Sequence, residues 1–275
     1  MELGIVEWIK VIAIGVIEGI TEWLPISSTG HMLLFDSLAA LEMDAAFKEM
    51  FFVVIQLGAI LAVVVLFWKK MWPLRGKPHL ALRRDVLSVW GKVAVACIPS
   101  AALGPLLDDF LETYFGGPAT IALMLIVYGA AFIWIERRNA RRRPRVGTLE
   151  EIDWGTALAI GAFQVLSMIP GTSRSGATIV GALLLGVGRT AAAEFTFFLA
   201  VPTMLGASAL KLVKFGFNFT RGEESVLLVG CAVAFTVSLL SIRFLMRYVQ
   251  KHDFRAFGWY RIALGVLVLA LYLFR

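Results

Sequence analysis

Two short polar stretches interrupt an otherwise apolar chain of 275 residues. The first, EGITEWLPISSTGH, runs from Glu18 to His31, and the second, PGTSRSGAT, runs from Pro170 to Thr178. A polar group buried without a partner costs free energy, and an ionisable group in an apolar setting is by default a functional-site candidate. The residues of these two stretches are therefore the candidates for chemistry.

Two carboxylates stand four residues apart in the first stretch. On a helix, Glu18 and Glu22 share one face, about one turn apart. Two carboxylates at such a short distance in a low dielectric resist ionising together. This favours either a bound divalent cation, Mg²⁺ or Ca²⁺, or a carboxyl group suited to general acid/base chemistry. The structural alternative is a pair that snorkels toward an interface or forms hydrogen bonds inside a helix bundle.

Hydroxyl groups and a histidine follow the carboxylates. His31 lies three residues after Ser28, within reach of a hydroxyl that it could activate or a leaving group that it could protonate. Ser28 is then the candidate nucleophile, and Ser27 and Thr29 are candidate phosphate-binding hydroxyls. Alone, His31 would more often be a structural histidine, but its neighbours favour a role in chemistry.

The one charged residue of the second stretch is an arginine. Arg174 lies in a glycine-bracketed turn that leads into an apolar run, so a guanidinium fork, hydroxyl groups and helix N-terminal amides come together, as a phosphate requires. The alternative is a buried salt bridge from Arg174 to Glu18 or Glu22, and both could hold in the resting state. The hydroxyl groups beside Arg174 are those of Ser173, Ser175 and Thr178. Together the residues of both stretches predict a phosphoryl-transfer or phosphate-hydrolysis site for a substrate whose other end is lipid.

The composition predicts the setting of this site. Hydrophobic residues make up 59% of the chain and charged residues only 17%, against about a quarter in ordinary soluble domains. The chain is therefore predicted to be an integral membrane protein. Six apolar runs are long enough to cross about 30 Å of hydrocarbon. They cover approximately residues 50–68, 86–107, 118–135, 194–213, 226–246 and 257–274.

The charged loops predict the orientation of these runs. Residues 69–85, 136–145 and 247–255 are rich in Lys and Arg and are assigned to the cytoplasm, whereas the acidic stretch 108–112 is assigned to the outside. The net charge of +6 is then a topology signal, and no nucleic-acid-binding face is predicted. Residues 1–49 and residues 150–193 must therefore enter the membrane from opposite sides, and each segment must return to the side from which it entered.

The polar stretches supply the turns for this return. Proline and glycine break each stretch where a re-entrant turn would need them, and an offset of 145 residues places Ser27 on Thr172 and Ser28 on Ser173. Paired breaks in inverted halves indicate a site near the membrane midplane. The predicted fold is all-α, with six transmembrane helices and two re-entrant helix pairs as inverted-topology repeats. It forms one polytopic domain, 1–275, with halves of approximately 1–135 and 150–275.

Both stretches resemble the signature regions of the undecaprenyl-diphosphate phosphatase family of the bacitracin-resistance type, and the resemblance covers essentially the whole chain. In that family an ExxxE motif leads into a Ser-Ser-Thr-Gly-His turn, and a PGxSRSxxT motif lies in the second half. Here the motifs stand at Glu18 to Glu22, Ser27 to His31 and Pro170 to Thr178. The resemblance implies that water removes the terminal phosphate of undecaprenyl diphosphate, which recycles the lipid carrier for peptidoglycan and other envelope polymers.

The resemblance also implies a divalent cation and a site open to the extracytoplasmic side of the bacterial inner membrane. By this resemblance Glu18 and Glu22 would serve the cation or acid/base chemistry, and Ser28 and His31 would be the nucleophile and its proton partner. Arg174, with Ser173 and Thr178, would hold the diphosphate. Direct attack by an activated water would use nearly the same residues.

Two other classes of protein are weighed against this enzyme. A lipid-phosphate transporter could use inverted repeats and a midplane site, although it would not require the pair of Ser28 and His31. A structural subunit without a ligand leaves the buried polar stretches unexplained. Membrane lipids and a polyprenyl diphosphate are the predicted partners, and the sequence leaves a homodimer open.

Overall fold

The computed structural model describes residues 4–75 and 81–274, and these residues are predominantly helical. Six helical segments are long and apolar enough to cross a membrane, which confirms the predicted number of spans and the class of multi-pass membrane protein. The spans are Ala45–Met71, Arg84–Leu107, Pro118–Asn139, Arg189–Phe215, Arg221–Val249 and Arg255–Leu273.

The first span combines two helices, α3 and α4, which meet at Ile55. Each of the other spans lies within a single helix. The helices are α1 (Ile5–Thr21), α2 (Ser28–Leu38), α3 (Ala45–Val54), α4 (Gln56–Met71), α5 (Arg84–Phe115), α6 (Pro118–Asn139), α7 (Trp154–Val165), α8 (Arg174–Leu184), α9 (Arg189–Phe215), α10 (Arg221–Val249) and α11 (Arg255–Leu273). A short 3-10 helix, η1 (Leu166–Met168), follows α7, and strands β1 (Leu74–Arg75) and β2 (Ala81–Leu82) pair antiparallel between α4 and α5.

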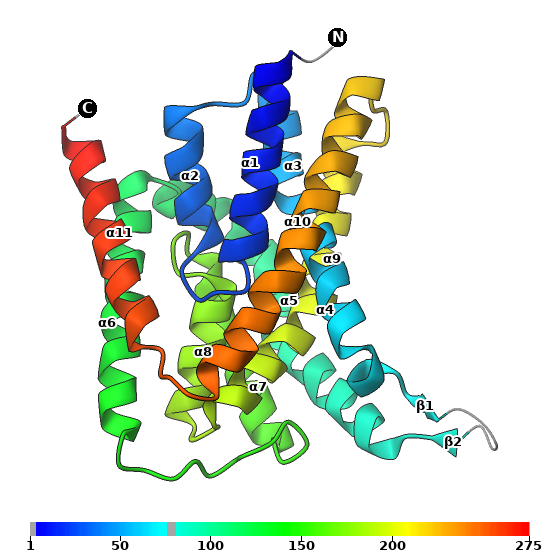
Figure 1. The fold of residues 1–275 in the computed structure, drawn as a ribbon, viewed down its shortest axis with the longest axis vertical. Helices are drawn as coiled ribbons and strands as arrows, with labels where there is room; N and C mark the ends of the chain where they lie inside the picture. The colour runs from blue at the N-terminus through cyan, green and yellow to red at the C-terminus, as the bar shows by residue number, and fades with distance from the viewer. Residues whose placement is uncertain (1–3, 76–80, 275) are drawn as a thin grey trace.

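Two short helix pairs enter the molecule from opposite ends (Figure 1). Helix α1 runs from the end with the N-terminus toward the middle, and α2 returns to that end, where Lys10 donates to the carbonyl of Ala40 over 2.7 Å. Helices α7 and α8 form the other pair, and the backbone N–H of Gly188, just after α8, bonds to the carbonyl of Val146 at the opposite end. The turns of the two pairs lie deep in the molecule.

The two returning helices begin in the same way. Ser27 caps α2 with φ 75°, and its hydroxyl accepts from the Gly30 N–H over 3.3 Å. Ser173 caps α8 with φ 70°, and its hydroxyl accepts from the Gly176 N–H over 3.3 Å. A serine side chain satisfies an otherwise unpaired amide of the first turn. The structure thus matches Ser27 with Ser173, one residue away from the predicted alignment of Ser27 with Thr172.

The basic connections gather at one end of the molecule. Strands β1 and β2, the loop between α6 and α7, and the connection between α10 and α11 all lie at the lower end in Figure 1, away from both termini. This is the end that the positive-inside rule predicted from the sequence to be cytoplasmic. The acidic stretch 108–112, predicted to be a loop, is instead helical, because α5 continues to Phe115. The side chains of residues 108, 109 and 112 lie outside the described part of the chain.

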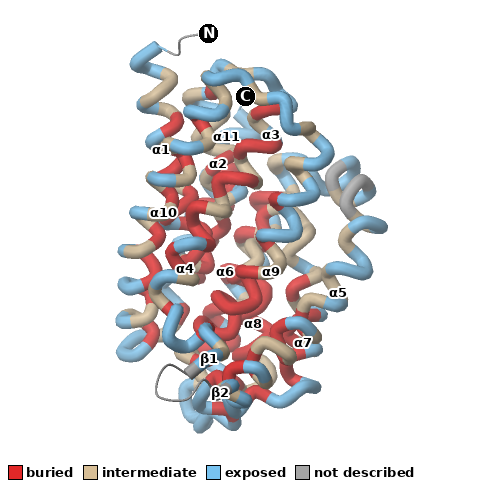
Figure 2. Tube along the Cα trace, turned by 90° about the vertical axis from the view of Figure 1, so that its right-hand side faces the viewer, coloured by how far each residue is buried: buried red, intermediate tan, exposed pale blue. Residues whose placement is uncertain are grey.

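Buried residues run through the middle of the bundle and surround α8 (Figure 2). Every residue of α8 from Ser175 to Leu183 is buried. Glycine permits close helix approach at Gly58, where an added Cβ would collide with the backbone oxygen of Cys231 on α10. Ion pairs also join the helices: Arg189 of α9 pairs with Glu136 of α6, and Glu194 of α9 pairs with Lys70 of α4.

Candidate active site

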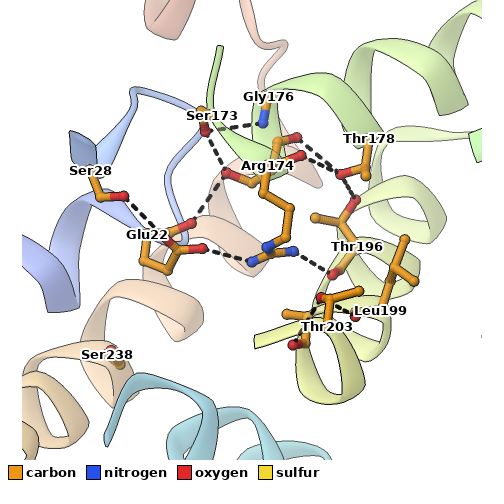
Figure 3. Close-up of polar contacts among 12 residues, drawn as sticks. Glu22, Ser28, Ser173, Arg174, Gly176, Thr178, Thr196, Leu199, Thr203 and Ser238 are labelled. Carbon is orange, nitrogen blue, oxygen red and sulfur yellow. Dashed lines mark hydrogen bonds and ion pairs between the residues drawn. The ribbon is translucent and has the colours of Figure 1, made fainter. Parts of the chain in front are cut away.

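The turns of the two helix pairs meet inside the bundle. Arg174, the first residue of α8, contacts Glu22, which lies at the end of α1, with 2.9 Å between Nη2 and Oε1. The hydroxyl of Ser175 donates to the backbone oxygen of Glu22 over 3.2 Å. Residues more than 150 positions apart in sequence thus form one network (Figure 3).

Glu22 is the centre of this network. Its Oε1 accepts from Arg174, and its Oε2 accepts from the Ser28 hydroxyl over 3.0 Å. The carboxylate is 8% exposed. A hydroxyl hydrogen-bonded to a carboxylate that a third group orients is the arrangement of an activated nucleophile and its general base. The same ion pair is the salt bridge that the sequence left as an alternative reading of Arg174.

Arg174 is held on several sides. Its Nη1 donates to the backbone oxygen of Thr196 over 2.9 Å, and its Cζ lies 5.9 Å from the centroid of the Trp23 ring. Its Nε is buried and has no hydrogen-bond partner among the described residues. A guanidinium fixed in this way places a positive charge close to the Ser28 hydroxyl, since both groups contact Glu22, and such a charge suits a phosphate group.

Glu18 lies one turn before Glu22 and is 1% exposed. Its Oε1 is buried without a partner among the described residues, so this carboxylate can accept a proton or a cation. Both oxygens of Glu22 already accept hydrogen bonds. Within the described residues no three His, Cys, Asp or Glu side chains gather around a common point. The two carboxylates therefore fit a cation only if other oxygens, such as those of a substrate phosphate, complete its shell.

Both ring nitrogens of His31 form hydrogen bonds. Its Nδ1 lies 2.7 Å from the backbone oxygen of Ser27, and its Nε2 lies 2.7 Å from the hydroxyl of Tyr260. A carbonyl only accepts, so Nδ1 carries the hydrogen, and in the neutral ring Nε2 accepts from Tyr260. Ser28 donates to Glu22 and is not a hydrogen-bond partner of the His31 ring in the described structure. A charged carboxylate is the stronger acceptor for its hydroxyl.

The other hydroxyl residues predicted to bind phosphate differ in their hydrogen-bond partners. Ser27 and Ser173 use their hydroxyls to cap α2 and α8, so they shape the turns. Thr178 shares a 2.9 Å hydrogen bond with the Thr196 hydroxyl. Ser175 joins the two turns through Glu22, as described above. Thr29 is exposed, and no hydrogen bond of its side chain occurs in the described structure.

Arg261 on α11 is a site residue that the sequence reasoning missed. It is fully buried, and its Nη1 donates to the backbone oxygen of Pro25 over 3.2 Å. Its Nη2 donates to the backbone oxygens of Gly171 and Thr172, each over 2.9 Å. One guanidinium therefore holds both turns. The available signal was an ionisable residue inside the apolar run 257–274, which is by default a functional candidate.

The chain also matches a known family. A family model described as "Bacitracin resistance protein BacA" matches residues 11–267, which include both turns and Arg261. This chain belongs to the BacA family. The match covers nearly the whole chain and confirms the resemblance drawn from the two polar stretches.

Curated relatives of this BacA-family chain carry the name "Undecaprenyl-diphosphatase". One from Enterococcus faecalis is 64% identical over 271 residues, which cover 98% of each chain. One from Desulfitobacterium hafniense is 58% identical over 268 residues, covering 97% of this chain and 96% of the relative. One from Lachnoclostridium phytofermentans is 54% identical over 271 residues, covering 98% of this chain and 99% of the relative.

Proposed function

We propose that this protein hydrolyses undecaprenyl diphosphate to undecaprenyl phosphate and inorganic phosphate in the bacterial plasma membrane. The observation that carries the proposal is the array of Ser28, Glu22 and Arg174, a hydroxyl, a base and a cation held in one network. It lies in a multi-pass membrane protein whose relatives at 64% and 58% identity are named as diphosphatases of this lipid.

In the proposed reaction the Ser28 oxygen attacks the terminal phosphorus, and its proton passes to Oε2 of Glu22. The bond from that phosphorus to the bridging oxygen breaks, and undecaprenyl phosphate leaves. Water then attacks the phosphoserine, the bond from phosphorus to the Ser28 oxygen breaks, and inorganic phosphate leaves. The Ser28 oxygen takes its proton back from Glu22, which restores the hydroxyl and the carboxylate. The Arg174 guanidinium stabilises negative charge on the transferring group in both steps. His31 is the proposed proton partner of the attacking water.

A divalent cation, Mg²⁺ or Ca²⁺, is part of the proposal. Glu18, with its unpartnered buried oxygen, would hold the cation together with Glu22 and the substrate's phosphate oxygens. Such a cation would neutralise charge on the diphosphate and orient it. Removal of divalent cations by a chelator should then lower the rate of phosphate release, and added Mg²⁺ or Ca²⁺ should restore it.

The finer topology is also proposed. We infer that α1 with α2 and α7 with α8 are re-entrant pairs related as inverted repeats, with halves of approximately 1–135 and 150–275. The matched caps at Ser27 and Ser173 support this relation, as does the return of each pair to the end it started from. The pair that carries Ser28 enters from the end opposite the basic loops, which favours a site open to the extracytoplasmic side.

The transporter reading is not favoured. A carrier could use Arg174 to bind a lipid phosphate, but it would not need a hydroxyl donating to a buried carboxylate, as Ser28 does. The named relatives are diphosphatases.

Phosphate release tests the proposal. Purified protein in detergent should release inorganic phosphate from undecaprenyl diphosphate and form undecaprenyl phosphate in equal amount. Undecaprenyl phosphate itself is the matched control substrate and should release none. No release from the diphosphate, with or without added divalent cation, would overturn the hydrolase function.

A further inference from the structure

A groove lined by arginines lies at the basic end of the molecule, away from the two turns. It encloses about 650 Å³ between the last residues of α6 and α8, the loop that follows α6 and the first residues of α9. Five arginines line it: Arg138, Arg142, Arg143, Arg145 and Arg189.

The groove has an excess of positive charge. Among the described residues Glu136 is its one acidic lining residue, and this carboxylate is already saturated. It accepts three contacts of 2.5 to 3.1 Å from Arg189 and one of 3.1 Å from the backbone N–H of Phe254, and its side chain is 1% exposed. Glu136 therefore has no capacity to pair with the other arginines.

Two of the arginines are exposed and available. Arg142 and Arg143 form no ion pair with any described residue, and both side chains are exposed. Helix α9 begins at Arg189, so its positive end also faces the groove. An anion with several oxygens would satisfy the guanidinium forks that the protein leaves unpaired.

Exposed tryptophans indicate where this groove lies relative to a bilayer. Trp134 is 58% exposed on α6, and the Cζ of Arg138 lies 5.7 Å from its ring centroid. Trp68 and Trp72 near the end of α4 and Trp154 at the start of α7 are also exposed. Tryptophan is enriched at the level of the lipid headgroups. The groove mouth is therefore at headgroup level, on the side assigned to the cytoplasm.

We propose that this groove binds the phosphate headgroup of an anionic membrane lipid. Basic pockets between transmembrane helices on the cytoplasmic side suit such headgroups, because the surface charge of that leaflet is negative. Free inorganic phosphate offers the same oxygens, but the position of Trp134 beside Arg138 favours a ligand anchored at the interface. The proposal is independent of the hydrolytic site.

Lipid binding to the purified full-length chain tests the proposal. Native mass spectrometry would follow the protein in detergent as it is titrated with dioleoylphosphatidylglycerol, dioleoylphosphatidylcholine or inorganic phosphate. The double variant Arg142→Gln/Arg143→Gln removes two groove charges. The matched control, Arg137→Gln/Arg141→Gln, removes two exposed charges from the same segment that do not line the groove. Melting temperatures of all three proteins establish that they are folded.

We expect wild type to bind phosphatidylglycerol at least about tenfold more tightly than phosphatidylcholine. The groove variant should bind phosphatidylglycerol on the order of thirtyfold more weakly, and the control should stay within about twofold of wild type. Equal losses in the two variants, or no lipid preference in wild type, would overturn the groove as a specific site. Displacement of phosphatidylglycerol by inorganic phosphate at equal concentration would overturn the lipid as its ligand.

Discussion

The Ser28 hydroxyl donates to Oε2 of Glu22 over 3.0 Å, and the two residues lie on opposite sides of the turn at Pro25. The turn folds the nucleophile candidate back onto a carboxylate of the preceding helix. Arg174 then brings a positive charge from the other half of the chain to the same carboxylate. The proposed chemistry depends on this meeting of two turns, and the predictions below test separate parts of it.

The ion pair between Arg174 and Glu22 should matter for both stability and rate. Arg174→Ala leaves the carboxylate buried without its partner, which we expect to cost about 3 to 5 kcal/mol of unfolding free energy. Arg174→Lys keeps the charge but loses the planar fork that reaches both Glu22 and Thr196. Its rate of phosphate release should fall on the order of 100-fold.

The double variant Arg174→Ala/Glu22→Gln provides the control for this pair. Removing both charges should recover part of the stability lost in Arg174→Ala, since no buried charge stays unpaired. It should recover no activity. A double variant as unstable as the sum of its single variants would show that the two residues are not coupled.

Arg261 should act as a positioning residue, because it holds the backbone of both turns without contacting Ser28 or Glu22 in the described structure. Arg261→Gln should lower kcat about 100-fold, as small displacements of reacting groups do, with a smaller change in KM. Arg261→Lys should restore part of kcat. The measurement is kcat and KM for phosphate release, well below the melting temperature. The control is Arg243→Gln, which changes an exposed arginine. A variant whose rate loss follows only its unfolded fraction would contradict the positioning role.

The hydrogen bond from Tyr260 to His31 should contribute to the rate of turnover. Tyr260→Phe removes the hydrogen bond to Nε2 but keeps the ring, so we expect roughly a fivefold loss of kcat, the equivalent of about one hydrogen bond. His31→Ala should lose more. The matched control is Tyr272→Phe, an exposed tyrosine on the same helix. Equal rates for Tyr260→Phe and Tyr272→Phe would show that the contact has no role in turnover.

The cap of α7 should make stability depend on pH. The backbone N–H of Thr156 bonds to the Asp153 side chain and, with nearby Arg145, holds its pKa below the ordinary Asp value. A lowered folded-state pKa gives stability that is present near pH 6 and lost as the pH falls below about 3.9. Asp153→Asn has no charge to lose. The melting temperature of wild type relative to Asp153→Asn should therefore be higher at pH 6 than at pH 3, and a constant difference would contradict the prediction.

The spans and their number followed from sequence because hydropathy and length are properties of contiguous residues. The confirmed membership of the BacA family rests on motifs that are also contiguous. The turn geometry was harder to predict. Serine rarely takes positive φ, so propensity gives no indication that Ser27 and Ser173 would both adopt it, and the predicted alignment was one residue off.

The partners of individual side chains were the least predictable part. The spacing of Ser28 and His31 suggested a pair, but spacing along a helix does not decide which acceptor a hydroxyl chooses. The buried Glu22 carboxylate competes for the same hydroxyl from the preceding helix. Arg261 was overlooked because its neighbours along the chain are apolar. Its polar partners are backbone carbonyls that only the tertiary fold brings to it.

The rate of phosphate release from undecaprenyl diphosphate by Glu22→Gln and Ser28→Ala tests the central claim most directly. The control is Ser225→Ala, which removes an exposed hydroxyl bonded within its own helix. Glu22→Gln and Ser28→Ala should each lose at least about 100-fold in kcat, and Ser225→Ala should stay within about twofold of wild type. A Glu22→Gln or Ser28→Ala variant that keeps the wild-type rate would contradict the account.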